Sequence, residues 1–409
     1  MNEINTTDIT VGHTEGGLAE LLRGESRYGH HCGVRRRWLR LPMPSERAFD
    51  AARALNMLCY GVTPDVSISQ DEIRKALTAD IAAMPLKDEL LGSNIDVVIL
   101  HDPQALGLAP VLAKLNQRLV WRLHLGTTTQ NAYTRQFWSL MGSYLRDCGV
   151  VIVHDKRYVP AHLGASVCEV RPGIDPLTVK NATQIVPSEA RSELARSPDR
   201  VEIHSDDADS LDSADVMLVQ LARWAPLKDP VAALRVAVPV LHSLPTAHIL
   251  LAGASSTTAQ AHDTLGATIL ERATHPGAIR RRMHVWSLPS DQNNNDQRLT
   301  GLVQCAGDVH LATSRAEGYG LAVAEAMWKG RPVVGRDVGG IERQIRCCAA
   351  GYVASSDDLL SRLALRLAAD PAMRSEIGSR ARRCVASHGL IDRNVAEVAT
   401  VLRRALQRR

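Results

Sequence analysis

The 409-residue sequence lacks several features that mark whole classes of protein. It has no apolar run of about eighteen residues, so we expect no membrane-spanning helix. The net charge is only +4, which argues against a generally basic, nucleic-acid-binding surface. The first residues, MNEINTTDITVGHTEGG, lack the basic and apolar blocks of a secretion signal. We therefore expect a cytoplasmic protein that binds neither nucleic acid nor membrane.

The eight cysteines form no metal-binding or redox motif. They are scattered, with no C-x-x-C pair and no histidine-rich segment at the spacing of a zinc site. We expect reduced, mostly buried thiols and no metal ion. The fingerprint G-x-G-x-x-G is missing after the first strand, which argues against a nicotinamide-dependent dehydrogenase.

Two charged segments are interpreted as solvated surface. The acidic SDDADS at 205–210 resembles a metal-binding cluster, but no strand delivers it to a site. The basic run Arg35–Arg37 is interpreted as an exposed face that could steer anions.

Short apolar runs of strand length recur between longer helical patterns. They are too apolar for strands with one face in water, so they are typical of parallel sheets covered on both faces. The sequence predicts an α/β protein with strands within 95–102, 118–125, 149–155, 215–223, 247–253, 282–288, 307–313 and 331–337.

The length and the 45% hydrophobic content predict two domains. The predicted strands fall into two groups, separated by a polar, acidic stretch at 197–215. We assign an N-terminal domain to 1–185, a linker to 186–214 and a C-terminal domain to 215–389, with a helix at 390–409 returning to the first domain. Two doubly wound sheets facing a cleft are expected, with ligands beyond the carboxyl ends of the strands.

The segment 315–340, RAEGYGLAVAEAMWKGRPVVGRDVGG, predicts a turn and a helix between two strands. Glycines at the helix start let backbone N–H groups approach an anion, which suits a diphosphate. Glu317 and Glu325 lie about two helical turns apart and can accept hydrogen bonds from sugar hydroxyls. Upstream, Arg223 and Lys228 follow a strand and can balance the phosphate charge.

Together, R-x4-K, E-x7-E, E-G-[FY]-G and EAMWKGRPVVGRDVGGI resemble the retaining GT-B glycosyltransferases of family four, also called glycosyl transferases group 1. The similarity is closest to the trehalose-synthase type, which joins a nucleotide-activated glucose to a sugar. It is specific through 215–385. In the N-terminal half it is carried by VVILHDPQ, VWRLHL, RQFW and PGIDPL.

The resemblance implies a role for each matching position. Catalytic roles are implied for His124, Glu317, Arg223 and Lys228. Donor binding is implied for Gly16, Gly17, Arg223, Lys228, Glu317, Gly318, Tyr319, Gly320, Leu321 and Glu325: the R-x4-K pair on the diphosphate, Glu325 on the ribose and Glu317 on the transferred sugar. Acceptor binding is assigned to His13, His101 and Gly126.

Three positions depart from the pattern of this group. Tyr319 stands where Phe is usual, Gly126 where the group reads H-I-D, and GHTEGG follows a weak, polar first strand where P-Y-G-G-G is usual. Two of the departures fall in the acceptor half. We therefore expect a specialised, antibiotic-type acceptor such as a cyclitol, amino sugar or thiol. The alternatives are a trehalose-forming enzyme with glucose as acceptor, or a nucleotide-sugar epimerase; a non-catalytic binder is disfavoured.

No carboxylate of the N-terminal domain stands out as a nucleophile, so the family's same-face substitution is the expected mechanism. In it the leaving diphosphate accepts the proton of the acceptor. No metal and no other cofactor is expected. The expected partners are the nucleotide-sugar donor and the small-molecule acceptor, and a homodimer is left open.

Overall fold

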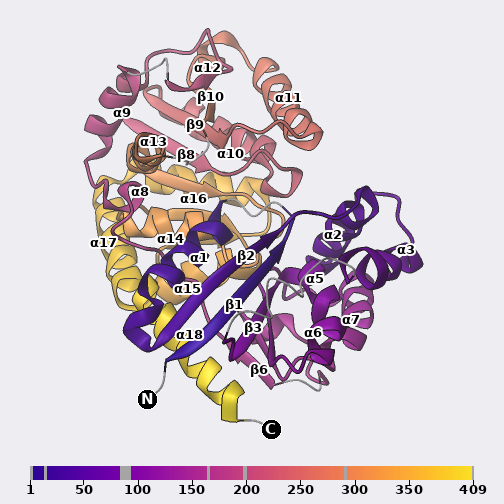
Figure 1. Ribbon diagram of the computed structural model, residues 1–409. Helices are drawn as coiled ribbons and strands as arrows, with labels where there is room; N and C mark the ends of the chain where they lie inside the picture. Colours follow the sequence, from indigo (N-terminus) through magenta and orange to yellow (C-terminus); the bar gives the residue numbers. More distant parts are fainter. Residues whose placement is uncertain are drawn as a thin grey trace. The chain divides into compact units, whose positions relative to one another are not determined.

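The computed structural model describes residues 3–12, 16–82, 94–163, 166–196, 200–289 and 293–407. The chain divides into two compact units. The first unit comprises Met1–Gly173, Glu317–Tyr319 and Leu390–Arg409, and the second comprises Ile174–Ala316 and Gly320–Gly389. Each unit is built on one sheet with helices on both faces (Figure 1).

The sheet of the first unit has six parallel strands in the order β2-β1-β3-β4-β5-β6. The strand order reverses at β1, so the carboxyl ends of β1 and β3 border a topological switch point, where ligands bind in such sheets. The strands are β1 (Ile4–Val11), β2 (Val34–Leu41), β3 (Val97–His101), β4 (Leu119–Leu123), β5 (Val150–Val153) and β6 (Ser166–Glu169).

Helices cover both faces of this sheet, because alternate residues of the strands point to opposite sides. Val98 and Leu100 pack in a core with α2 and α7, whereas Val97 and Ile99 pack in a core with α18 (Figure 1). The α-helices of the unit are α1 (Gly17–Tyr28), α2 (Glu46–Cys59), α3 (Gln70–Lys75), α5 (Asp102–Ala105), α6 (Ala109–Lys114), α7 (Ala132–Leu145) and α18 (Ile391–Gln407), with a π-helix at Ala76–Ile81.

The sheet of the second unit has seven strands in the order β13-β12-β11-β8-β9-β10-β7, all parallel except β7. Its order reverses between β8 and β11, which puts the segments after these two strands at the switch point. The strands are β7 (Glu202–Ile203), β8 (Val216–Leu221), β9 (Ala247–Ala254), β10 (Met283–Leu288), β11 (Val309–Ala312), β12 (Val333–Arg336) and β13 (Gly351–Ala354).

Two cores flank this second sheet. One packs α10 and α16 against residues such as Leu218 and Ile249, and the other packs α9 and α13 against Met217 and Leu250. The α-helices are α8 (Val179–Ala182), α9 (Pro187–Ala195), α10 (Pro230–Ser243), α11 (Ala259–Ala273), α12 (Gly277–Arg280), α13 (Asn294–Ala306), α14 (Leu321–Trp328), α15 (Gly339–Cys348), α16 (Asp357–Ala369) and α17 (Pro371–His388).

The eight strands predicted from apolar runs are all confirmed. The apolar pattern missed five strands: the central β1, which carries three threonines and Asp8, and the four edge strands β2, β6, β7 and β13. An edge strand is partly exposed and carries polar residues, so it does not read as a continuous apolar run.

The segment 186–214, which we interpreted as a linker, contains ordered elements of the second unit. Ala190 and Leu194 of α9 are buried in the core that includes α13. Arg191 of the same helix donates to the carbonyl of Ala306 and to Asp308. The few apolar positions in this polar sequence are spaced to bury one helical face, which the composition alone does not reveal.

The expectation of reduced cysteines is wrong for one pair. Cys348 at the end of α15 and Cys384 in α17 form a disulfide, with their Cα atoms 5.6 Å apart. They are separated by 36 residues, and packing of the two helices brings them together. Among the described helices, none is both long enough and apolar enough to cross a membrane.

The packing of α18 generates a stability prediction. Leu402 is fully buried in the core of the first unit, so Leu402→Ala should lower the free energy of unfolding by about 2–5 kcal/mol. Arg404→Ala, on the exposed face of the same helix, should change it by less than about 0.5 kcal/mol. Urea denaturation followed by circular dichroism measures both. Equal effects of the two substitutions would contradict the assignment of α18 to this core.

Candidate functional site

Polar side chains gather at the carboxyl edge of the first sheet. His101 ends β3, while His124 and His154 follow β4 and β5. The Nδ1 atom of His101 lies 2.9 Å from Nε2 of His124, and Nδ1 of His124 lies 3.3 Å from Nε2 of His154. On the other side, Nε2 of His101 lies 2.9 Å from Oδ1 of Asp8 in β1. These four residues, which we call the histidine row, are thus joined end to end.

Asp8 fixes the protonation of this row. Burial alone would raise the pKa of the Asp8 carboxyl, but the Arg36 guanidinium and His101 hold this pKa well below its ordinary value. Arg36 lies on the neighbouring strand β2 and binds both carboxylate oxygens. The interpretation of Arg35–Arg37 as an exposed face is therefore wrong for Arg36, whose side chain is 2% exposed because it turns inward from the edge strand.

The ionised Asp8 determines the tautomers of the histidines. His101 donates its Nε2 proton to Asp8, so its Nδ1 atom accepts a proton from Nε2 of His124. Nδ1 of His124 then accepts from Nε2 of His154. Burial lowers the pKa of His101, lowers that of His124 well below its ordinary value, and brings that of His154 to about 3. The three histidines of the row are therefore neutral at physiological pH, and both ring nitrogens of His124 are engaged.

Asp102, which the sequence analysis did not assign, lies beside this row. It begins α5 with a left-handed φ of 63°, a conformation that is uncommon outside glycine and concentrates at functional sites. Its Oδ1 atom accepts the backbone N–H of His124 at 2.9 Å. Burial raises the pKa of Asp102 to about 7. Its position directly after the buried strand VVILH is the sequence feature that could have identified Asp102 as a site residue.

Gly126 and Gly318 are both required by close packing in the first unit. A Cβ on Gly126, whose φ is 149°, would lie 2.3 Å from Cδ2 of Tyr158. A Cβ on Gly318 would lie 2.4 Å from the carbonyl oxygen of His124. Tyr158 also donates its hydroxyl to the carbonyl of Gly318 at 2.7 Å. Gly126 thus accommodates the Tyr158 ring, which leaves no space for the aspartate that the family pattern leads one to expect.

The turn that carries Glu317 and Tyr319 groups with the first unit. Glu317 is partly buried, and the ring of Tyr319 meets the ring of His154 edge to face at 5.7 Å. At the start of α1, Gly16 has a left-handed φ of 65° with open space around it, so its backbone conformation favours glycine. Gly17 is the first residue of α1. His13, assigned to the acceptor, lies outside the described residues.

In the second unit, Arg223 and Lys228 follow β8. Arg223 is exposed, and Lys228 ends a 3-10 turn at Pro226–Lys228. The carbonyl of Lys228 accepts hydrogen bonds from Gln220 at 2.9 Å and from Thr313 at 3.3 Å. Gln220 lies in β8 and Thr313 directly follows β11, so the loop is tied to both strands at the switch point.

The start of α14 is suited to an anion. Gly320 precedes the helix with a left-handed φ of 88°, and no side chain caps the first turn, which begins at Leu321. The unsatisfied N–H groups of a helix start and its dipole attract negative charge. Gln344 donates to the carbonyl of Gly320 at 3.2 Å and helps to hold the turn.

Glu325 is buried in α14 rather than exposed on a ligand-facing surface. Its Oε1 atom lies 2.8 Å from Nζ of Lys180, and its Oε2 atom accepts from Gln304 at 2.6 Å. Lys329, one turn later, donates to the carbonyls of Lys180 at 2.6 Å and Asn181 at 3.1 Å. Burial lowers the pKa of Lys329 to about 8. The segment around α8 is thereby fastened to α14.

The structure thus gathers the assigned residues into two sets, one in each unit. The first unit holds Gly16, Gly17, His101, His124, Gly126, Glu317, Gly318 and Tyr319, and the second holds Arg223, Lys228, Gly320, Leu321 and Glu325. Sequence reasoning missed the side chains that position them: Asp8, Asp102, His154, Tyr158, Lys180 and Gln304. Within the described residues, no group of three or more His, Cys, Asp or Glu could hold a metal ion.

Two family descriptions match the chain, one in each half. Residues 4–160 match the trehalose synthase N-terminal domain, and residues 292–384 match glycosyl transferases group 1. The trehalose synthase of Pyrococcus horikoshii is 27% identical over 390 residues, which cover 95% of this chain and 86% of that protein.

Solved structures share the fold. Trehalose-6-phosphate synthase OtsA has a TM-score of 0.74 at 13% identity, covering 98% of this chain and 99% of OtsA. Anabaena HepE, solved in complex with UDP and glucose, has a TM-score of 0.67 at 14% identity, covering 98% of this chain and all of that one. The predicted α/β class and GT-B architecture are confirmed. With a trehalose synthase N-terminal domain followed by a glycosyl transferases group 1 domain, the chain belongs to the nucleotide-sugar-dependent GT-B glycosyltransferases.

Proposed function

We propose that this protein transfers glucose from a nucleotide sugar to a second glucose, forming trehalose with retention of configuration. The observation that carries the proposal is the extent of the similarity to trehalose synthase, which runs over 95% of the chain and so includes the acceptor half. Nothing in the comparisons supports the antibiotic-type acceptor that we expected from the sequence. Gly126, which replaces the usual aspartate, makes room for the ring of Tyr158. This packing accounts for the substitution without a different acceptor.

The donor is proposed to bind the second unit through its diphosphate. Arg223 and Lys228 supply positive charge, and the uncapped start of α14 supplies backbone N–H groups. The fixed backbone of Lys228 supports this role, because a held loop directs the side chain at little entropic cost. The complex of HepE with UDP and glucose supports a nucleotide-sugar ligand for this fold.

Glu325 is proposed to accept hydrogen bonds from the ribose hydroxyls. Lys180 and Gln304 contact one carboxylate oxygen each and so hold the Glu325 side chain in one orientation. Glu317 and the turn at Gly318 and Tyr319 are proposed to hold the transferred sugar.

The acceptor is proposed to bind at the carboxyl edge of the first sheet. Asp102 offers an oxygen beyond the one that accepts the His124 N–H, and a carboxylate is a strong acceptor for a sugar hydroxyl. His101 and the ionised Asp8 hold the His124 ring in one tautomer beside it. This gives His101 a positioning role in place of direct acceptor binding.

The proposed reaction is a same-face substitution. The bond from the sugar C1 to the diphosphate oxygen breaks, and a bond forms from C1 to the acceptor oxygen. The acceptor proton passes to the departing diphosphate. Arg223, Lys228 and the α14 start stabilise the growing charge of the leaving group. Neither a metal ion nor another cofactor is required in this scheme.

The proposed function is tested by incubating the enzyme with UDP-, ADP- and GDP-glucose, with and without glucose. We expect disaccharide formation with glucose and only slow nucleotide release without it. Transfer to a cyclitol or amino sugar but not to glucose would revive the specialised acceptor. Nucleotide release with sugar isomerisation and no acceptor would indicate an epimerase.

Lys228→Ala should reduce kcat/KM by roughly 30- to 1000-fold, or about 2–4 kcal/mol of transition-state stabilisation, because one electrostatic donor is removed. Steady-state kinetics with glucose and the preferred donor measures the effect. Lys114→Ala, an exposed lysine of the first unit, serves as the control and should be near wild type. A folded Lys228→Ala enzyme with normal turnover would remove this residue from the site.

Asp102 should impose a pH dependence on acceptor use. Its pKa is raised to about 7, so the carboxyl is protonated below that pH and loses its acceptor strength. The kcat/KM for glucose should therefore fall as the pH drops below about 7. Asp102→Asn, which tolerates the left-handed backbone, should be roughly 10- to 100-fold slower and should lack this limb of the profile. An unchanged pH profile in the variant would assign the limb to another group.

Exhaustive treatment with EDTA should leave the initial rate within about twofold of the untreated value, because side chains and a helix start meet the diphosphate charge. The untreated enzyme with added Mg²⁺ provides the comparison. Strict dependence on Mg²⁺ or Mn²⁺ would overturn the metal-independent scheme.

A further inference from the structure

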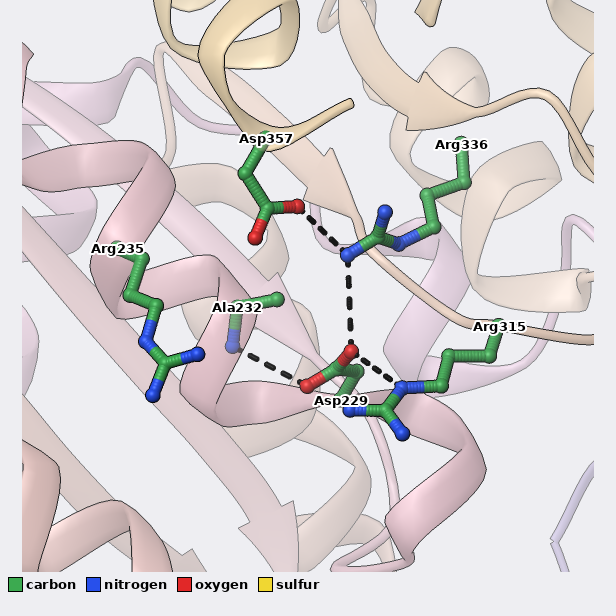
Figure 2. A pocket seen from close by; sticks show the side chains of 6 residues that line it. All are labelled: Asp229, Ala232, Arg235, Arg315, Arg336 and Asp357. Carbon is green, nitrogen blue, oxygen red and sulfur yellow. Dashed lines mark hydrogen bonds and ion pairs between the residues drawn. The ribbon is translucent and has the colours of Figure 1, made fainter. Parts of the chain in front are cut away.

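The second unit contains a pocket lined by charged residues that have no role in the proposed transfer. Figure 2 shows this pocket, with a volume of about 340 Å³. Three arginine side chains and two carboxylates line it, from α10, the segment after β11, the end of β12 and the start of α16. The lining residues are Asp229, Ala232, Arg235, Arg315, Arg336 and Asp357.

Most carboxylate oxygens of the pocket already accept hydrogen bonds from other residues that line it. Oδ1 of Asp229 accepts the N–H of Ala232 at 3.2 Å, and its Oδ2 accepts Nε of Arg315 at 2.7 Å (Figure 2). Oδ1 of Asp357 accepts Nη2 of Arg336 at 2.7 Å, and the same nitrogen lies 3.6 Å from Asp229. Asp357 retains its second oxygen as an acceptor.

The arginines, by contrast, keep donors available. Arg315 uses only Nε, and Arg235 uses Nε and Nη2 on Glu271. Among the described residues, no hydrogen bond engages Nη1 or Nη2 of Arg315 or Nη1 of Arg235. Both side chains are more than half exposed and can reorient toward a ligand. The pocket lining carries three positive and two negative side chains, and Glu271 outside the lining pairs with Arg235. The pocket therefore offers an anion unused N–H donors rather than a large net positive charge.

Two long helices begin at the pocket and add to this preference. Asp229 precedes α10, and Asp357 is the first residue of α16. Their dipoles favour negative charge at these ends. A guanidinium presents paired N–H donors whose geometry matches the oxygens of a phosphoryl group.

We propose that this pocket binds the phosphoryl group of a small phosphorylated carbohydrate, at a place separate from the nucleotide-sugar. Arg315 and Arg235 hold the phosphoryl oxygens, and the second oxygen of Asp357 accepts a hydroxyl of the sugar. The volume accommodates a ligand of this size. Inorganic phosphate shares the phosphoryl chemistry but lacks the hydroxyl contact, so it should bind more weakly.

Occupation of the pocket bears on the transfer site through the chain itself. Arg315 precedes Glu317 by two residues, and Asp229 directly follows Lys228. A ligand that draws Arg315 from Asp229 therefore acts on both segments. This regulatory consequence rests on the proposed function, whereas the binding claim does not.

Calorimetry on the full chain tests the binding claim, with glucose 6-phosphate and inorganic phosphate titrated separately at low ionic strength. The double variant Arg235→Gln, Arg315→Gln should raise the Kd for glucose 6-phosphate at least tenfold. Arg298→Gln, which removes another exposed arginine from an ion pair with Glu193, is the matched control and should stay within twofold. Circular dichroism verifies that each variant is folded.

The remaining outcomes separate the two claims. Unchanged binding in the double variant, or binding lost in Arg223→Gln instead, would overturn the site. Equal affinity for glucose 6-phosphate and phosphate would overturn the sugar contact. If glucose 6-phosphate binds but changes neither kcat nor KM of the wild-type enzyme, the regulatory consequence is overturned while the site stands.

Discussion

Four buried charged side chains, joined in series by ion pairs, hold the carboxyl edge of the first sheet in place. Arg122 pairs with Glu25, Glu25 with Arg36, and Arg36 with Asp8, and no side chain of the four is more than 2% exposed. An unpaired charge at such depth would be strongly destabilising, so each member depends on its neighbours. The chain links α1, β1, β2 and β4 and ends at the carboxylate that sets the tautomer of His101. The tautomer and orientation of the His124 ring follow from it, while burial lowers the pKa of His124 and keeps the ring neutral.

The assigned residues of the second unit are also held in fixed positions, but by separate contacts rather than by a linked series of ion pairs. Its assigned residues are held by hydrogen bonds from neighbouring chain segments: Gln220 and Thr313 fix the Lys228 loop, and Lys180 and Gln304 fix Glu325. The groups proposed to bind the ligands thus lie at switch points whose backbone is fixed by buried polar contacts. A preorganised site of this kind meets developing charge without having to rearrange.

Apart from the polar β1, the central strands could be predicted from the sequence, as could the donor motifs, because each is local. A buried parallel strand is a continuous apolar run, and R-x4-K or E-x7-E lies within one turn or helix. The charge chain could not be predicted, because Glu25 and Arg122 are 97 residues apart and Arg36 lies in an edge strand that looks solvent-facing. The same limit applies to Gly126, whose meaning depends on Tyr158, and to the disulfide between Cys348 and Cys384. These features depend on contacts between residues far apart in the sequence, which a single sequence does not reveal.

The identity and linkage of the product test the proposed trehalose formation most directly. Proton NMR of the disaccharide formed from an α-linked nucleotide-glucose and free glucose reports the configuration at both anomeric carbons. We expect a single symmetric product with two α-linked anomeric centres. A β configuration at the transferred sugar would contradict same-face substitution, and a product linked through any other position of the acceptor would contradict trehalose formation.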